Sequence, residues 1–303
     1  MDTSRPIDPF AALDAAGVLV FRRRLDHLAG LYLPPDPRDG RAIPAVLINV
    51  AHPPSKQRFT AAHELGHHLR DHAIILDSDT EMLARGATPA SDRERLAEAF
   101  AAWFLMPRRL VLDTLTILDL RPDGLDADGA YALALALGTS YAATVRHLAD
   151  MGVLTTRQSE QLLRVAPQAI KRDRGGSDVV ADSWKDVHRV LVTRLDAVTT
   201  VEGDAIVLEA PEIPSSGYVW QAPAPPAGLT LVRDDYLASG GDEIGGRGWR
   251  RFLFRVDAPG RGDVILEKRR PWQRGAAIET ARVAVTASPP PAPGIVQPRV
   301  LVA

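Results

Sequence analysis

One short stretch sets the strongest constraint on this chain: residues 58–72 read as a helix that carries a His-Glu-x-x-His pattern. Residues four apart lie one above the other on a helix, so His63 and His67 project from one face. Two imidazoles at this spacing can hold one Zn²⁺, and Glu64 beside them can accept a proton from a metal-bound water. The alternative is a solvated helix face, because the bare pattern also occurs by chance.

A glycine inside this helix points to a second helix nearby. Gly66 costs about 1 kcal/mol relative to alanine, which predicts that another backbone passes close to it. A third zinc ligand is also needed, and the pattern with a histidine six residues after His67 is excluded, because Ala73 stands there. The third ligand must therefore come from elsewhere in the chain.

Residues 91–105 are the candidate for that second helix, which Pro107 ends. They carry Glu94 and Glu98. The large apolar side chains, Leu96 among them, define a buried arc, and Glu94 lies roughly 40° nearer to it than Glu98 does. Glu94 is therefore the preferred ligand. The alternative is a capping box, in which Glu94 satisfies the backbone N–H of Ser91.

Composition limits the other classes of function. The 303 residues suggest two domains, and 46% hydrophobic with 24% charged residues is typical of a soluble protein. A net charge of −2 gives no bulk attraction to nucleic acid or acidic membranes. There is no cysteine, which excludes disulfides and thiolate zinc sites. The first residues lack a signal-peptide pattern, and no apolar run is long enough to span a membrane, so we expect a cytoplasmic protein.

Short β-prone runs precede the first helix, at residues 17–21, 28–33 and 43–50. A short sheet that runs into a His-Glu-x-x-His helix is the zincin arrangement, in which an edge strand pairs with the extended backbone of the substrate. Residues 45–50 are the candidate for that edge, with a purely structural strand as the equal alternative.

The segments 58–68 and 94–107 together resemble the ImmA/IrrE family of zinc metallopeptidases, and the resemblance extends over about residues 7–165. It implies an α+β zincin-like core (1–107) with one zinc ion, His63, His67 and Glu94 as ligands, and Glu64 as catalytic base. This chain has Glu98 where the family usually has asparagine. Members are implied to cleave cytosolic transcriptional repressors under stress or in mobile-element control.

Residues 108–167 are expected to form a helical, helix-turn-helix-like subdomain of the same family. The helix that starts at Ser140 would contact DNA in one interpretation, but it offers only Arg146 and His147 as basic groups. The other interpretation is a packing unit that closes the peptidase domain or docks the repressor, and we favour it over direct DNA binding.

A glycine-containing charged segment (168–183) is expected to be a linker, and residues 184–288 an antiparallel β-sandwich. The predicted strands are 205–210, 218–222, 229–233, 249–256, 263–268 and 281–287. A proline-rich tail (289–303) is expected to be disordered.

Three segments of the sandwich resemble the chagasin family of cysteine-protease inhibitors, which have an immunoglobulin-like fold. The residues expected to bind a partner are Ser215, Ser216, Gly217 and Tyr218, then Gly245, Gly248 and Trp249, and finally Arg270, Pro271 and Trp272. The resemblance implies that these three loops form a wedge that enters a papain-like active-site cleft. The first loop departs from the family: Ile213 replaces an asparagine, and two serines replace two threonines. The alternative is a sandwich that binds something else.

The leading hypothesis is therefore a cytoplasmic zinc metalloendopeptidase with a protein-binding immunoglobulin-like domain. A second hypothesis is a cysteine-protease inhibitor or recruitment protein whose first domain serves only for docking. A third is a DNA-binding regulator. The intact set of His63, Glu64, His67 and Glu94 favours the first.

Overall fold

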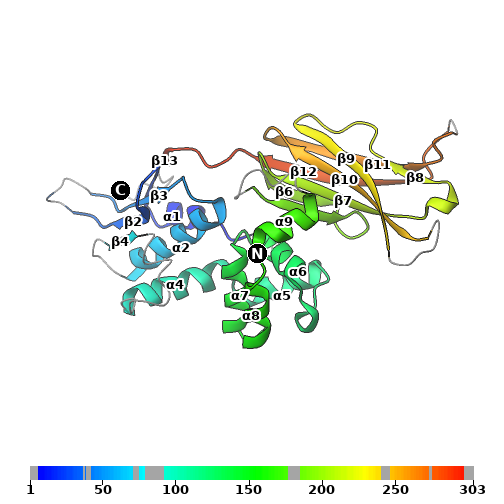
Figure 1. Ribbon diagram of the computed structural model, residues 1–303. Helices are drawn as coiled ribbons and strands as arrows, with labels where there is room; N and C mark the ends of the chain where they lie inside the picture. The colour runs from blue at the N-terminus through cyan, green and yellow to red at the C-terminus, as the bar shows by residue number, and fades with distance from the viewer. Residues whose placement is uncertain are drawn as a thin grey trace. The chain divides into compact units, whose positions relative to one another are not determined.

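The computed structural model describes residues 6–36, 38, 42–70, 75–78, 92–176, 185–239, 246–272 and 275–296. It contains helices and sheets in two compact units (Figure 1). The first unit is made by residues 1–165 together with 291–303, and the second by residues 166–290. Among the helices of the described ranges, none is long and apolar enough to cross a bilayer.

The first unit is built on a sheet with the strand order β13-β1-β3-β2-β4. The strands are β1 (Leu19–Arg23), β2 (Leu28–Leu33), β3 (Ala45–Asn49), β4 (Ile75–Ser78) and β13 (Gly294–Val296). β1 and β3 run parallel, and the other neighbours are antiparallel. A core that includes Leu13, Val20 and Tyr32 forms between this sheet and the helices α1 (Pro9–Ala15) and α2 (Pro54–Arg70).

The expectation of a substrate-pairing edge at residues 45–50 is wrong. β3 lies between β1 and β2, so neighbouring strands occupy both of its sides. Its nearly continuous burial is typical of an internal strand rather than of an exposed edge. β4, beside β2, is the edge on that side of the sheet within the described residues.

Helix α2 lies between the sheet and α4 (Asp92–Leu105) (Figure 1). Arg58, near its start, fixes it at two points: Nε donates to the carbonyl of Gly138 at 2.9 Å, and Nη2 donates to the carbonyl of Ile7. Gly138 itself adopts φ +65°, a left-handed conformation that suits glycine, and a Cβ there would lie 2.8 Å from the Arg58 side chain. Arg58 thus ties α2 to the segment just before α1 and to the turn at Gly138.

Residues 108–165 are helical, as expected. The elements are α5 (Arg108–Ile117), η2 (Pro122–Gly124), α6 (Ala127–Leu137), α7 (Tyr141–Asp150) and α8 (Thr156–Leu163). Polar side chains cap three of the helices at their first N–H groups: Asp126, Ser140 and Thr155. Gly138 and Thr139 form the turn between α6 and α7.

The second unit is a sandwich of two four-stranded sheets, with orders β5-β7-β10-β9 and β6-β12-β11-β8. Its strands are β5 (Val187–Leu191), β6 (Ala197–Val201), β7 (Ala205–Glu212), β8 (Val219–Gln221), β9 (Leu229–Ala238), β10 (Gly248–Val256), β11 (Gly260–Arg269) and β12 (Glu279–Ser288). The core between the sheets includes Trp220, Phe252 and Phe254. β5 and β6 were not predicted from the sequence. They pair in parallel with β7 and β12, so the sheets are mixed rather than antiparallel.

Two expectations about the connecting segments are corrected. The first half of the predicted linker is helix α9 (Pro167–Gly175), which packs on β5 and β7. Its Lys171 and Arg174 are buried and donate to the carbonyls of Lys185 and Val187. Residues 167–175 are therefore an ordered helix rather than part of a flexible linker. The predicted disordered tail contains β13, which pairs with β1 of the first unit.

Candidate functional site

The side chains of His63, His67 and Glu94 converge in the first unit. The Nε2 atoms of the two histidines lie 3.0 Å apart, and the Glu94 carboxylate lies 3.2 Å from His63 Nε2 and 3.5 Å from His67 Nε2. One potential ligand atom from each residue lies within 4.8 Å of the others. The histidines are buried, whereas the Glu94 side chain keeps 18% of its surface exposed. A cation held here would therefore have three ligands and one open side, and Glu98 is not part of the group.

A close crossing of two helices brings these residues together. A Cβ at Gly66 would lie 3.0 Å from the Phe100 ring and 3.5 Å from Cα of Ala97, which confirms that another backbone passes this glycine. Glu94 precedes Ala97 by one turn, so it reaches the histidine face. The buried residues of α4 are Ala97, Ala101 and Leu105. Leu96, which helped to place the buried arc, is 42% exposed, whereas Phe100 of the same predicted arc faces Gly66 of α2.

Glu94 carries a negative charge at neutral pH. Side-chain hydrogen bonds with His63 and His67 lower the pKa of its carboxyl group to about 2, against the opposing effect of burial. A charged carboxylate with two imidazoles is the donor set that zinc takes in many hydrolytic sites, so these residues fit that ion. Ser91, the partner in the capping-box alternative, lies outside the described residues.

Glu64 is fully buried beside this group, against strand β2. A Cβ at Gly30 would lie 2.8 Å from Glu64 Oε1 and 2.3 Å from Cγ2 of Thr60, so α2 approaches the strand at the position that has no side chain. Gly30 was not among the residues predicted to shape the site. A glycine within a short β-prone run was the available signal, since such a glycine often marks a close backbone approach.

A second contact of the same strand was also missed. The hydroxyl of Tyr32 and Nδ1 of His68 lie 3.0 Å apart, and their rings meet edge to face. Tyr32 stands two residues after Gly30, so both face α2 from the same side of β2. His68 therefore faces the sheet rather than the solvent.

Helix α7 presents little that could bind DNA. His147 is buried and its Nε2 lies 2.9 Å from the carbonyl oxygen of Met106, while Trp103 packs against its ring. Of the two basic groups expected to reach DNA, Arg146 alone is exposed. A single cation is far from the several phosphate contacts that DNA binding needs.

In the second unit, the first and third predicted loops lie side by side. The Arg270 guanidinium stacks 4.6 Å from the centre of the Tyr218 ring, and a Cβ at Gly217 would lie 3.0 Å from the Trp272 ring. Trp272 is 69% exposed. Gly217 adopts φ +75° at the end of a short turn in which the Ser216 hydroxyl donates to the carbonyl of Ile213. Ser215 and Pro271 are exposed beside them.

The second predicted loop leads into the same end of the sandwich. Gly248 pairs with Glu212, the last residue of β7, and Trp249 pairs with Pro211. Gly248 is buried, and a Cβ there would lie 2.3 Å from the Tyr236 hydroxyl oxygen, so it allows close strand packing and offers no contact surface. Gly245 lies outside the described residues.

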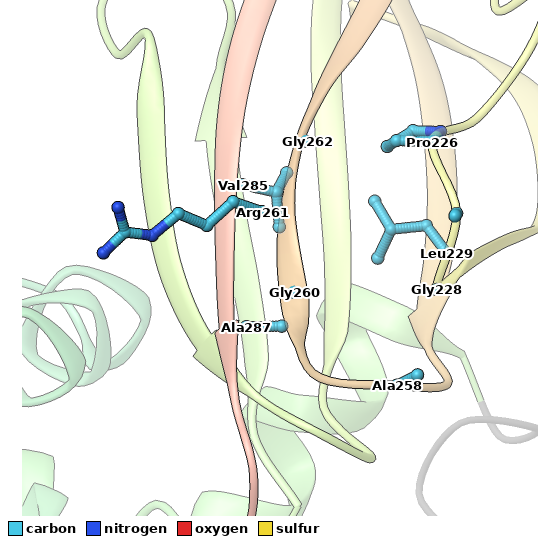
Figure 2. A pocket seen from close by; sticks show the side chains of 10 residues that line it. Pro226, Gly228, Leu229, Ala258, Gly260, Arg261, Gly262, Val285 and Ala287 are labelled. Atoms are coloured by element: carbon cyan, nitrogen blue, oxygen red, sulfur yellow. The ribbon is translucent and has the colours of Figure 1, made fainter.

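Figure 2 shows a hollow at the opposite end of the sandwich. It is lined by residues such as Pro226, Leu229, Ala258 and Gly262, and it encloses about 10 Å³. This volume has room for about one water molecule, so the hollow cannot accept a peptide.

Two family models match the chain. Residues 13–119 match the IrrE N-terminal-like domain of the Peptidase_M78 family. Residues 199–287 match the chagasin family peptidase inhibitor I42. None of the curated proteins that were compared matches the chain. The first match implies a metallopeptidase, and therefore a metal, and His63, His67 and Glu94 are a candidate site for it.

Solved structures also match about a third of the chain. A crystal structure of the cysteine protease inhibitor EhICP2 from Entamoeba histolytica is 20% identical, with a TM-score of 0.32, and covers 35% of this chain and 100% of its own. The solution structure of Amebosin is 20% identical, with a TM-score of 0.30, and covers 34% and 98%. PbICP-C in complex with falcipain-2 is 12% identical, with a TM-score of 0.22, and covers 34% and 91%. Because these values are low, the family matches carry the assignment. The chain thus joins a segment that matches the IrrE-like Peptidase_M78 model to a segment that matches the chagasin inhibitor model.

Proposed function

We propose that the first unit is a zinc-dependent metalloendopeptidase with a zincin-like fold. The observation that carries the proposal is the convergence of His63, His67 and Glu94 from two crossing helices, with Glu64 buried beside them. The three residues would hold one zinc ion. The alternative of a domain that serves only for docking would not need this buried, charged and mutually bonded set.

The bound ion would supply an acidic water and a Lewis acid that polarises the scissile carbonyl. Glu64 would take the proton from that water and later pass it to the leaving amine. Its complete burial against Gly30 of β2 limits the motion of its side chain. The exposed part of Glu94 marks the open side from which a peptide would approach.

The substrate would be an extended protein segment. The β4 edge lies next to β2, the strand that contacts Glu64, and backbone pairing at such an edge is a common way to hold a peptide. We propose a cytoplasmic regulator as the substrate, in line with the repressors implied by the family resemblance. Incubating the protein with repressors encoded beside its own gene, with and without a chelator, tests this choice.

The test of the chemistry is Glu64→Gln, with Glu98→Gln as the matched control on α4. We expect the first variant to keep one zinc ion per chain and to lose peptide cleavage, because only the proton acceptor is removed. The control should keep both. Undiminished cleavage by pure Glu64→Gln protein would refute the assignment of the base.

A second function belongs to the second unit. We propose that its loop end engages a protein partner, since Trp272, Tyr218 and Arg270 form one contiguous surface of aromatic and arginine side chains. A papain-like cysteine protease is the partner that the family match favours. Pull-down with immobilised papain, read against the Trp272→Ala variant, tests it.

A further inference from the structure

The last strand that the structure describes, β13, belongs to the first unit, although the whole sandwich separates it from the rest of that unit in sequence. β13 pairs antiparallel with β1, with Val296 opposite Val20 and Gly294 opposite Arg22. Figure 1 shows it at the sheet of the first unit, in which β1 separates it from β3. The chain therefore leaves the first unit after residue 165 and returns to it at residue 291.

Different residues of β1 direct their backbone N–H and C=O groups toward its two neighbouring strands. The N–H of Leu19 donates to Pro44, and the carbonyl of Arg23 accepts from Val50, so these residues face β3. Backbone groups alternate along a strand, and the groups of Val20 and Arg22 therefore face the other side, where β13 lies. The outer edge of β1 thus presents two residues whose backbone groups are ready to pair.

The described side chains of β13 add little to these backbone bonds. The strand is three residues long, Gly294 has no side chain, and the side chain of Ile295 is 54% exposed. Each ordered residue loses backbone entropy, so a free peptide of this length would bind only weakly. A strand tethered by the short run 289–293, which contains four prolines, is present at an effective concentration of about millimolar or more. The tether explains how so short a strand can stay docked.

We propose that the outer edge of β1 is a docking site for an extended peptide strand, and that its occupant is residues 294–296 of the same chain. Docking closes an edge that would otherwise be open to strand addition by other chains. With β13 docked, the chain connects the two units twice, after residue 165 and before residue 291. Release of β13 would leave one connection and a free β1 edge.

The experiment compares two proline variants by amide hydrogen exchange of the full-length protein. Val296→Pro removes the N–H that faces Val20, whereas Ile295→Pro removes an N–H that faces away from β1. We expect Val296→Pro to accelerate exchange at Val20 and Arg22 at least about tenfold. Exchange at Leu19 should not change, because that amide bonds toward β3. Ile295→Pro should keep the protection of the parent protein.

Equal exchange at Val20 in the two variants would overturn the docking site. Light scattering over a range of protein concentrations distinguishes the source of the strand. Monomers whose Val20 and Arg22 amides remain protected at low concentration support docking within one chain. Dimers whose protection is lost on dilution would overturn that choice and assign the strand to a second copy.

Discussion

Gly30→Ala is the most direct test of how the structure positions Glu64. The new Cβ would lie 2.3 Å from Cγ2 of Thr60, 2.8 Å from Glu64 Oε1 and 3.2 Å from the carbonyl oxygen of Leu47. Carbon atoms in contact prefer about 3.5–4.0 Å, so the strand and α2 must move apart. Overpacking of this kind costs typically about 1–3 kcal/mol. With three close contacts we expect the upper part of that range, about 2–3 kcal/mol.

Denaturant unfolding of the metal-free protein measures this loss, with Gly124→Ala as the control. A Cβ at Gly124 meets nothing within 4 Å, so that variant should stay within about 0.5 kcal/mol of the parent. Thr60→Ser removes the methyl group that is closest to the new Cβ. In the double variant we expect a favourable coupling of at least about 1 kcal/mol between positions 30 and 60.

The double variant also separates folding from catalysis. Thr60→Ser relieves the methyl contact but leaves the new Cβ near the Glu64 carboxylate. Zinc binding should therefore recover together with stability, while cleavage stays low. Additive free energies, or a Gly30→Ala protein as stable as its parent, would refute the close approach of β2 to α2.

Three further predictions concern single side chains. Glu94→Ala should lose zinc in a metal-affinity titration and Glu98→Ala should keep it, because only Glu94 lies with the histidines. Trp272→Ala should abolish partner capture by the second unit without unfolding it, since this side chain is largely exposed. Asp204→Asn should destabilise the second unit at neutral pH by about 1–3 kcal/mol, because the charged carboxylate accepts several buried hydrogen bonds.

The stability that Asp204 contributes to the second unit should fall in acid. Burial raises the pKa of Asp204, but hydrogen bonds from His188 and from the N–H groups of Asp186 and Val201 outweigh it, and the pKa is lowered. The stabilisation is therefore present above the unfolded pKa of about 3.9 and is lost as the pH falls through the lower folded value. The Asn variant should show a smaller loss in acid than its parent does. Equal losses would contradict this role.

The predictions for Glu94 and Trp272 each have an outcome that would contradict them. Zinc retained by Glu94→Ala and lost by Glu98→Ala would reverse the choice of ligand. Gly217→Glu places a charge beside Trp272 at a position with φ +75°, so it should also block partner capture. A partner still bound by the variant that combines Trp272→Ala and Gly217→Glu would rule out the loop end as the interface.

Local patterns in the sequence predicted the helices and strands in which apolar residues repeat at a regular spacing. The spacing of His63 and His67 places them on one helix face, and Gly66 already indicated the helix that passes it. Alternating runs likewise marked the strands of the sandwich from β7 to β12. These features follow from the spacing of residues that are close in sequence, so the periodicity of the sequence predicts them.

Features that depend on distant partners were not predictable in this way. Nothing near Gly30 in sequence shows that Thr60 and Glu64 pack on it, and nothing near Ile295 shows that β1 is its partner. The position of β3 was unpredictable for the same reason. Its apolar run is compatible with an edge strand or an internal strand, and only its pairing with β1 and β2 shows that it is internal. In each case the decisive contact joins a short strand to a segment remote in the chain. Substitutions at Gly30 and Val296 therefore test the parts of the fold that local sequence patterns leave open.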